Sequence, residues 1–249
     1  MTSEIEQQQL WVDAALGANA AEFNVRASRR ARRLGMRVSR TGRIEVVTPA
    51  RTPKSRIEQF IAEHRNWALE KRNEALRTAP APERFPPTEV SFRIDATRWR
   101  LHLAGGRGRP SLRQSPSGVL QVTGATDGAA TRALLRGWLM SRARAVLEPR
   151  LASIALEFSI RYHSLSVRQQ RTRWGSCSSR GAINLNASLV FQRPEVVRYL
   201  MIHELTHVEH LNHSPRFWHA VESRCADWRT LDRELLEGWR RVPSWVYAE

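Results

Sequence analysis

A short segment near the carboxyl end, His203-Glu204-Leu205-Thr206-His207, carries residues whose types and spacing could perform hydrolytic chemistry. Side chains four residues apart on an α-helix lie one above the other, so His203 and His207 could bind the same divalent ion. Glu204 is turned about 100° from His203 and would reach a water molecule bound to that ion. The pattern therefore predicts a zinc site with two imidazole ligands and a carboxylate that acts as a base.

A third ligand is required, because catalytic zinc is held by three protein ligands and keeps a fourth position open. His213 follows His207 by six residues, the spacing used where a helix ends and the chain turns back toward the metal. Asn212 tolerates a left-handed backbone and so favours a helix end at this place. Random placement would give the five-residue pattern about 0.02 times, and with the third histidine roughly 0.0006 times. We therefore expect His203, His207 and His213 as zinc ligands and Glu204 as the catalytic base.

Other residues compete for the third ligand position. His210 lies on nearly the same helix face as the motif, but it is seven residues from His203, about 10 Å along an unbroken helix. Glu222 would complete a site of two histidines and one glutamate, and His219 lies on the same predicted helix. We favour His213, with His210 on the surface or in a supporting role and His219 as an exposed helical residue.

Two predicted strands and one predicted helix position these residues. Residues 164–171 and 182–190 indicate strands, and the second alternates apolar and polar side chains so that one of its sides is polar. A helix is expected from Pro194, which suits the first helical position, and Glu195 is favourable near the positive end of the helix dipole.

The preceding part of the chain is rich in strands. We expect strands at Arg43–Val47, ended by Pro49, and at 90–104, with a hairpin around Ser117-Gly118. Helices are predicted at 55–76, capped by Ser55, and at 131–158. The four prolines of 78–89 favour a linker.

The order strand, turn, strand, helix thus occurs twice, with Trp67 and Trp138 in comparable places. These patterns predict an α+β fold in three parts: a tail or accessory helix at 1–22, a strand-rich basic region with two helices at 23–150, and a metal-binding hydrolase domain at 151–249.

The chain is strongly basic. It has 40 Lys and Arg against 24 Asp and Glu, a formal net charge of +16, and only Lys54 and Lys71 are lysines. Eight arginines lie between Arg26 and Arg43. Arginine binds phosphate and carboxylate groups through two parallel hydrogen bonds, so nucleic acid, nucleotides or acidic proteins are possible partners. A general arginine bias of composition, or a solvated strand face, would explain the same counts.

The remaining features point to a cytoplasmic protein that is not inserted in a membrane. Cys177 and Cys225 are too few for a disulfide framework, and we expect both to be reduced. The amino-terminal residues are acidic and polar, unlike a signal peptide. No run of about 18 apolar residues occurs that could span a membrane.

Several blocks together resemble the YgjP-like metallopeptidase family, relatives of the SprT-type zincins. The matching segments are Arg173–Cys177, Asn184–Asn186, His203–His207, Asn212–Ser214 and Phe217–Trp218. The resemblance covers about residues 173 to 218, and the amino-terminal part agrees more loosely. It implies that the three histidines bind zinc and that Glu204 is the base of a zincin-like metallopeptidase acting on peptide or protein substrates.

The resemblance also suggests where a substrate would bind. In zincins an extended peptide pairs with an edge strand above the metal helix, and the 182–190 strand has the polar side that such pairing needs. For Trp174–Cys177 we favour a tight turn packed by Trp174, over backbone donors at the cleft or Cys177 near the metal. Tyr199, Arg173 and His210 are candidates for stabilising the oxyanion.

The sequence is compatible with two other functions. The same metal-bound water could hydrolyse a nucleotide or another phosphate ester, as the arginine surplus suggests. Alternatively, the chain could be a nucleic-acid-associated protein whose zinc is structural. The expected function is a zinc-dependent peptidase.

Overall fold

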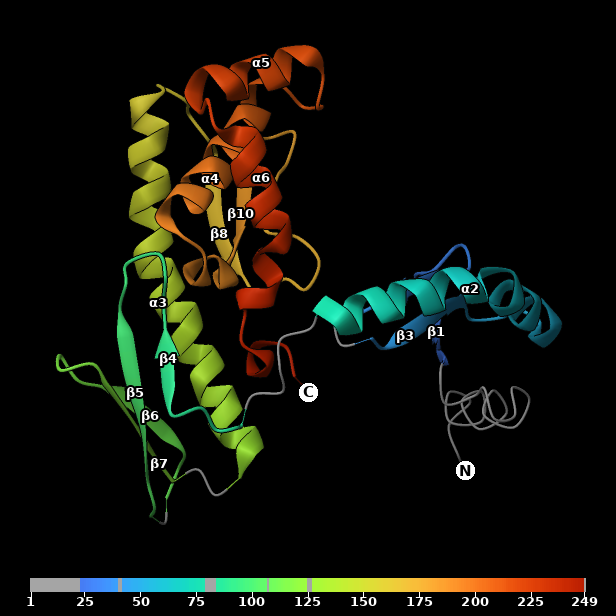
Figure 1. Cartoon of the computed structure of the whole chain (residues 1–249), viewed down its shortest axis with the longest axis horizontal. Helices are drawn as coiled ribbons and strands as arrows, with labels where there is room; N and C mark the ends of the chain where they lie inside the picture. Colours follow the sequence, from blue (N-terminus) through green and yellow to red (C-terminus); the bar gives the residue numbers. More distant parts are fainter. Residues whose placement is uncertain (1–22, 40–41, 79–83, 107, 125–126, 249) are drawn as a thin grey trace. The chain divides into compact units, whose positions relative to one another are not determined.

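The computed structural model describes residues 23–39, 42–78, 84–106, 108–124 and 127–248 of the chain. By its internal contacts the chain divides into two compact units, Met1–Ala79 and Pro80–Glu249. Helices are combined with three small sheets in the described part, which confirms the expected α+β fold (Figure 1). The segment 1–22, expected to be a tail or accessory helix, lies outside the described residues.

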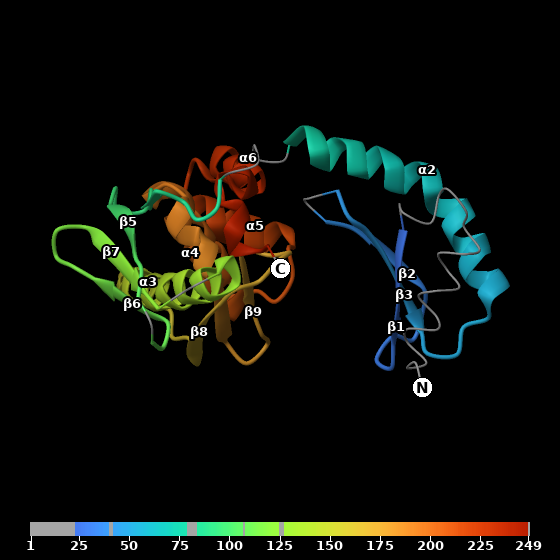
Figure 2. The same ribbon diagram turned by 90° about the horizontal axis from the view of Figure 1, so that it is seen from below.

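The first unit contains one sheet and one long helix among its described residues: β1 (Phe23–Ser28), β2 (Gly35–Val38), β3 (Ile44–Pro49) and α2 (Lys54–Thr78). The central strand β3 is parallel to β1 and antiparallel to β2. Alternate residues of β3 point inward, as the two-residue period of a strand requires. Ile44 and Val46 therefore pack with Ile57 and Ile61 of α2, which lies along one face of the sheet (Figure 2).

The second unit begins with a four-stranded sheet in the order β4-β5-β7-β6, made of β4 (Glu89–Ser91), β5 (Arg98–Ala104), β6 (Ser111–Gln114) and β7 (Val119–Thr123). The predicted hairpin is confirmed, since β6 and β7 are antiparallel and Gly118 in their turn has a φ of +76°. The helix α3 (Gly128–Glu157) follows, capped by an N–H bond of Ala130 to Asp127 at 2.7 Å.

A second sheet of this unit has the order β8-β10-β9, made of β8 (Ser164–Arg168), β9 (Gly175–Cys177) and β10 (Ala182–Asn186). After it come the 3-10 helix η2 (Ala187–Phe191), the helices α4 (Pro194–Glu209), α5 (Pro215–Arg224) and α6 (Trp228–Glu237), and the short 3-10 helices η3 (Gly238–Arg241) and η4 (Ser244–Val246). Fully buried side chains of α3, β10 and α4, such as Leu151, Leu185 and Met201, belong to the same core.

One arrangement of three strands and a helix occurs three times in the described chain. In each of β1-β3-β2, β5-β7-β6 and β8-β10-β9, the central strand is the last of the three in the chain. It is parallel to the strand that comes first in the chain and antiparallel to the strand that comes second. A helix then follows each set, namely α2, α3 and α4. The recurrence expected from the sequence is therefore present with a third copy, but Trp67 is 44% exposed whereas Trp138 is buried, so the two tryptophans are not equivalent.

Several expected element boundaries were wrong. The strand expected at 90–104 is divided into β4 and β5, and the strand expected at 164–171 ends at Arg168. The helix α2 begins at Lys54, and Ser55 lies within its first turn instead of capping it. The strand expected at 182–190 ends at Asn186, because the Asn186 side chain accepts a 3.0 Å hydrogen bond from the N–H of Ser188 and starts the 3-10 helix η2. The strand β10 is also central, paired on both sides, and is not an edge strand.

The units divide after Ala79, whereas α3 continues across residue 150, where the sequence placed a domain boundary. That 151–249 forms a domain of its own stays a prediction. Among the described residues, no helix combines the length and the apolar character that a membrane crossing requires.

Candidate metal centre

The helix α4 presents the two motif histidines on one face, as the sequence predicts. Pro194 occupies its first turn and Glu195 lies there as the expected acidic residue. Most residues of the helix are buried, among them Met201 and Leu205, which are fully inaccessible. This packing fixes the rotation of the helix about its axis and so determines the direction in which His203 and His207 point.

The chain reverses between α4 and α5 and brings a third histidine back to the same place. The helix α4 ends at Glu209, and the next residue, His210, has an extended backbone and an N–H that bonds to the carbonyl of Thr206. Ser214 then caps α5 by accepting from the N–H of Phe217. Asn212 has no positive φ, so the expected left-handed helix end was wrong, although the reversal itself is present.

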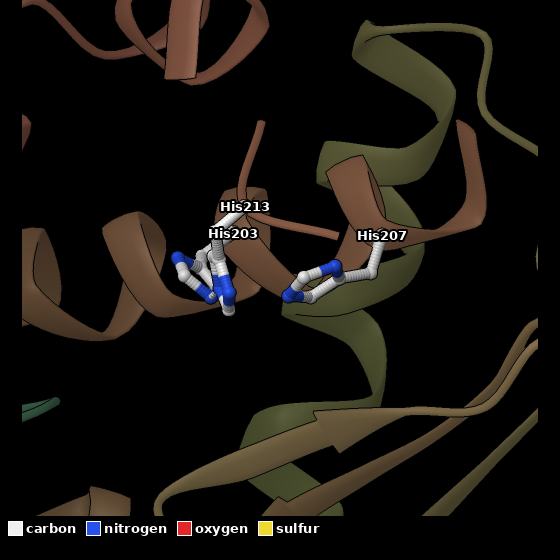
Figure 3. Close-up of side chains that lie close together, drawn as sticks. All are labelled: His203, His207 and His213. Carbon is white, nitrogen blue, oxygen red and sulfur yellow. Dashed lines mark hydrogen bonds between the residues drawn. The ribbon is translucent and has the colours of Figure 1, made fainter. Parts of the chain in front are cut away.

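The ring nitrogens of His203, His207 and His213 converge (Figure 3). All three ligand atoms lie within 4.8 Å of one another, and the Nε2 atoms of His203 and His213 are 3.1 Å apart. Zinc binds imidazole nitrogen at about 2.0–2.1 Å, so two nitrogens of a tetrahedral site are separated by about 3.3 Å. These residues therefore fit a divalent metal ion of this kind.

The protonation of the imidazoles suits metal binding. Burial lowers the pKa of His203 to about 3, with further contributions from His207 and His213. Burial likewise lowers the pKa of His207. The Nδ1 atom of His207 lies 3.0 Å from the backbone carbonyl of His210, which holds the proton on Nδ1 and leaves Nε2 as an acceptor.

Aromatic side chains of α5 hold the three rings. Phe217 is fully buried, stacks on His207 with ring centroids 4.5 Å apart and meets His203 and His213 at their edges. Trp218 stacks on His213 at 5.4 Å and on Trp228 of α6 at 4.3 Å. The histidine outside α4 is thus fixed by α5, which the sequence alone does not reveal.

Arg224 ties α5 to the end of α4. Its guanidinium donates to the hydroxyl of Thr206 at 3.1 Å and pairs with Glu209 at 2.6 Å. Only 17% of the Arg224 side chain is exposed, so this contact is better protected from solvent than an ordinary surface pair. The bond fixes the two ends of the reversal that carries His213.

Glu204 is buried beside the histidines and lacks a partner for one of its oxygens. The residue is 4% exposed, and its Oε2 atom has no hydrogen-bond partner among the described residues. Burial raises the pKa of Glu204 to about 8, while the charge of Arg173 acts in the opposite direction. An isolated buried carboxyl is costly to keep, so its position beside the histidine cluster favours a chemical role.

Gly175 on β9 makes room for this carboxyl group. A Cβ atom at position 175 would lie 2.5 Å from Oε1 of Glu204, closer than any side chain could stay without moving. The tight turn expected at Trp174–Cys177 was wrong, because Gly175–Cys177 form the edge strand β9 against β10. The sequence offers no signal for this role beyond the glycine itself.

The other sequence candidates are not brought to the cluster. The carboxylate of Glu222 pairs with Arg229 at 2.5 Å, and His219 is exposed on α5. His210 contributes its carbonyl to His207, in agreement with a supporting role. Cys177 is not part of the histidine cluster, and burial raises the pKa of its thiol to about 11.

The hydroxyl of Tyr199, a candidate for stabilising the oxyanion, has another hydrogen-bond partner. Its hydroxyl donates to Asp232 at 2.8 Å, and burial raises the pKa of the phenol. Cys177 and Cys225 are both free cysteines.

A helix with two histidines four residues apart, a third histidine beyond its end and a buried glutamate next to the first histidine fits a zincin-like site. Comparison with known families agrees, because the family described as YgjP-like, metallopeptidase domain, matches residues 32–237. The chain belongs to this family.

Two solved structures are similar to parts of the chain. One is the metallopeptidase zymogen of Methanocaldococcus jannaschii jannalysin, 18% identical, covering 36% of this chain and 96% of that chain with a TM-score of 0.31. The other is the metallopeptidase zymogen of Pyrococcus abyssi abylysin, 23% identical, covering 38% and 96% with a TM-score of 0.32. No curated protein matches the chain.

Proposed function

We propose that this chain is a zinc-dependent peptidase in which His203, His207 and His213 bind the metal and Glu204 is the catalytic base. The observation that carries the proposal is the convergence of the three ring nitrogens within 4.8 Å beside a buried glutamate. Family membership makes peptides or proteins the substrate class. Zinc as the physiological metal and a cytoplasmic location belong to the same proposal.

Each side chain has a definite task in this reaction. Bound zinc supplies an acidified water and polarises the scissile carbonyl group. Glu204 accepts a proton at its unpartnered Oε2 and can return it to the leaving amine, since a carboxyl group beside the water bound to the metal can reach both. Phe217 and Trp218 hold the imidazoles in place.

The substrate would pair with β9 instead of the strand expected from the sequence. β9 is an edge strand of β8-β10-β9 and contains Gly175, which directly adjoins Glu204. An extended peptide added to that edge would run past the carboxyl group and the metal ligands. On the paired side of β9 the side chain of Asn184 donates to Ser176 at 3.4 Å, which supports the strand.

The proposal is tested with the purified full chain loaded with zinc. Bound metal is measured by mass spectrometry, and cleavage is followed with unfolded casein and a fluorogenic peptide library. We expect one zinc ion per chain and peptide cleavage that falls by about 100-fold or more in Glu204→Gln, the usual size of a general acid–base contribution. Glu222→Gln, an exposed glutamate on α5, is the matched control.

Release of phosphate or pyrophosphate from nucleoside triphosphates is measured in the same samples. Turnover of nucleotides that is lost in Glu204→Gln, with no cleavage of any peptide, would replace the peptidase proposal by a phosphate-ester hydrolase. If the native chain binds zinc but Glu204→Gln behaves like the native chain in every assay, the metal has only a structural role.

A further inference from the structure

The first unit gathers arginines at one end of its sheet. Because β1 and β3 are parallel, both finish at the same end, where Ser28 pairs with Pro49. Gly35, the first residue of β2, also pairs close to that end, with Val47 of β3. The loop 29–34 and the turn 50–53 therefore leave the sheet side by side.

These two connections carry most of the uncompensated charge of the unit. The loop contributes four arginines, all exposed, and the second connection and the start of α2 contribute two more: Arg29, Arg30, Arg32, Arg33, Arg51 and Arg56. None of the six forms an ion pair with a carboxylate of the described residues. We call these six residues the arginine end.

Along the strands of the sheet, in contrast, arginines form ion pairs. Arg26 lies on β1 and Arg37 on β2, and both donate to Glu45 on the central strand. Burial would raise the pKa of Glu45, but the two guanidinium groups outweigh it and hold the pKa below its usual range. A uniform bias toward arginine does not explain why the arginines on the strands pair with a carboxylate while those of the arginine end do not.

The helix α2 adds to the positive potential of this end. It begins at Lys54, immediately after the turn, and has no acidic residue in its first turn. The partial positive charge of a helix amino terminus thus adjoins the arginine end without a carboxylate to cancel it. Over the whole of Met1–Ala79 the sequence has 15 Lys and Arg against nine Asp and Glu, a net charge of +6.

We propose that the arginine end binds the phosphate backbone of nucleic acid, without preference for sequence. Guanidinium groups bind phosphate oxygens bidentately, and four of them within five positions can engage several successive phosphates. Exposed side chains on a loop suit a flexible, accessible polyanion. This binding is independent of the peptidase proposal, because none of its residues belongs to the metal centre.

The test measures binding of the full chain to a 20-nucleotide mixed-sequence RNA and to a 20-base-pair DNA duplex by fluorescence anisotropy between 50 and 300 mM salt. The test variant replaces Arg29, Arg30, Arg32 and Arg33 by glutamine. The control variant removes the same charge from four exposed arginines scattered over the second unit, Arg144, Arg180, Arg233 and Arg240. A third variant replaces the four loop arginines by lysine.

We expect the native chain and the control to bind both probes with an affinity that falls steeply with salt. The loop variant should bind at least 10-fold more weakly and should lose about 0.7 from its logarithmic salt slope for each phosphate contact removed from a single strand. The lysine variant should recover part of the affinity. Thermal melting of each variant shows that it is folded.

Equal weakening in the loop and control variants would overturn the proposal, because net charge alone would then explain binding. So would tighter binding to polyglutamate of matched charge than to either nucleic acid, which would identify an acidic protein as the partner. Peptide cleavage does not enter this readout, so failure here leaves the metal centre untouched.

Discussion

Gly175 and Glu204 are in contact so close that no side chain fits between them: a Cβ atom at position 175 would lie 2.5 Å from Oε1 and 2.8 Å from Cγ of Glu204. Gly175 lies on the edge strand β9 and Glu204 on the helix α4, and the two residues are 29 positions apart in the sequence. A single hydrogen atom at position 175 thus lets the strand approach the carboxyl group that we assign as the base.

Replacing Gly175 by alanine should displace the whole carboxyl group of Glu204. Because a shift of about 1 Å in a catalytic group can cost 100-fold in rate, we expect kcat/KM for peptide cleavage to fall by about that factor. Zinc content should stay near that of the native chain, since no histidine is touched. The measurement is kcat/KM together with metal analysis.

Gly137→Ala is the matched control for this substitution. An added Cβ at Gly137 meets nothing within 4 Å, and alanine favours a helix such as α3. Activity within twofold of native in Gly175→Ala would show that the carboxyl group need not sit where the structure places it.

Removing the ligand outside α4 should weaken metal binding strongly. We expect His213→Ala to raise the zinc dissociation constant by more than about 100-fold, beyond the effect of losing a residue that only supports a ligand. His219→Ala, exposed on the same stretch of chain, should bind zinc as the native chain does. Competition with a chromophoric chelator measures both.

The same experiment separates His213 from His210. His210 contacts His207 through its backbone carbonyl, which alanine would keep, so His210→Ala should retain zinc. Loss of zinc in His210→Ala together with retention in His213→Ala would exchange the two assignments.

Phe217 should matter for the metal as well as for stability. It is fully buried and contacts all three histidine rings, so Phe217→Ala should cost about 3–5 kcal/mol of unfolding free energy and also reduce zinc affinity. Denaturant unfolding and zinc titration under native conditions measure the two effects.

Phe92→Ala provides the comparison. Phe92 is equally buried but packs on Trp138 and Phe191, away from the histidines. A similar loss of stability with unchanged zinc affinity is expected there. If Phe92→Ala lowers zinc affinity as much as Phe217→Ala does, the contact of Phe217 with the histidine rings has no specific role in metal binding.

Because of the ion pair between Arg193 and Glu234, the stability of the second unit should decrease at acid pH. Arg193 precedes α4 and donates to both carboxylate oxygens of Glu234 on α6, which lowers the pKa of that carboxyl. A carboxyl with a lowered pKa in the folded state contributes stability above its unfolded pKa near 4.5 and loses it as the pH falls through the folded value. We expect Glu234→Gln to cost about 1 kcal/mol at pH 7 and the difference from native to shrink toward pH 3.

Glu222→Gln is the control for this pair. Glu222 and Arg229 also form an ion pair, but both side chains are more exposed, at 46% and 65%, so solvent screens their interaction. A smaller effect at pH 7 is expected. Equal effects of the two substitutions would mean that the bond between α6 and the start of α4 is no stronger than a surface contact.

The local elements of the metal site were predictable because their signals are local. Four-residue spacing places His203 and His207 on one helix face wherever that helix lies, and proline at the first helical position marks its beginning. The hairpin at Ser117-Gly118 was predictable for the same reason, since a turn with positive φ selects glycine.

The sequence-based predictions failed where contacts with residues distant in the chain determine the structure. The strand expected at 182–190 ends early because the side chain of Asn186 caps a 3-10 helix and also donates to the carbonyls of Gln170 and Arg173. The alternation of apolar residues continues through this segment, so periodicity could not locate the end. Which strand lies at the edge depends on pairing order, and no local pattern encodes it.

The sequence by itself determined the chemistry available: three imidazoles and a carboxylate at spacings typical of a metal-dependent hydrolase, because ligand type and helix geometry are properties of short segments. Only the tertiary structure decided how that chemistry is arranged. Packing of α5 against α4 brings His213 to the other two rings, and pairing of β9 with β10 sets Gly175 against Glu204. These are contacts between segments whose separation in the chain carries no signal of their distance in space.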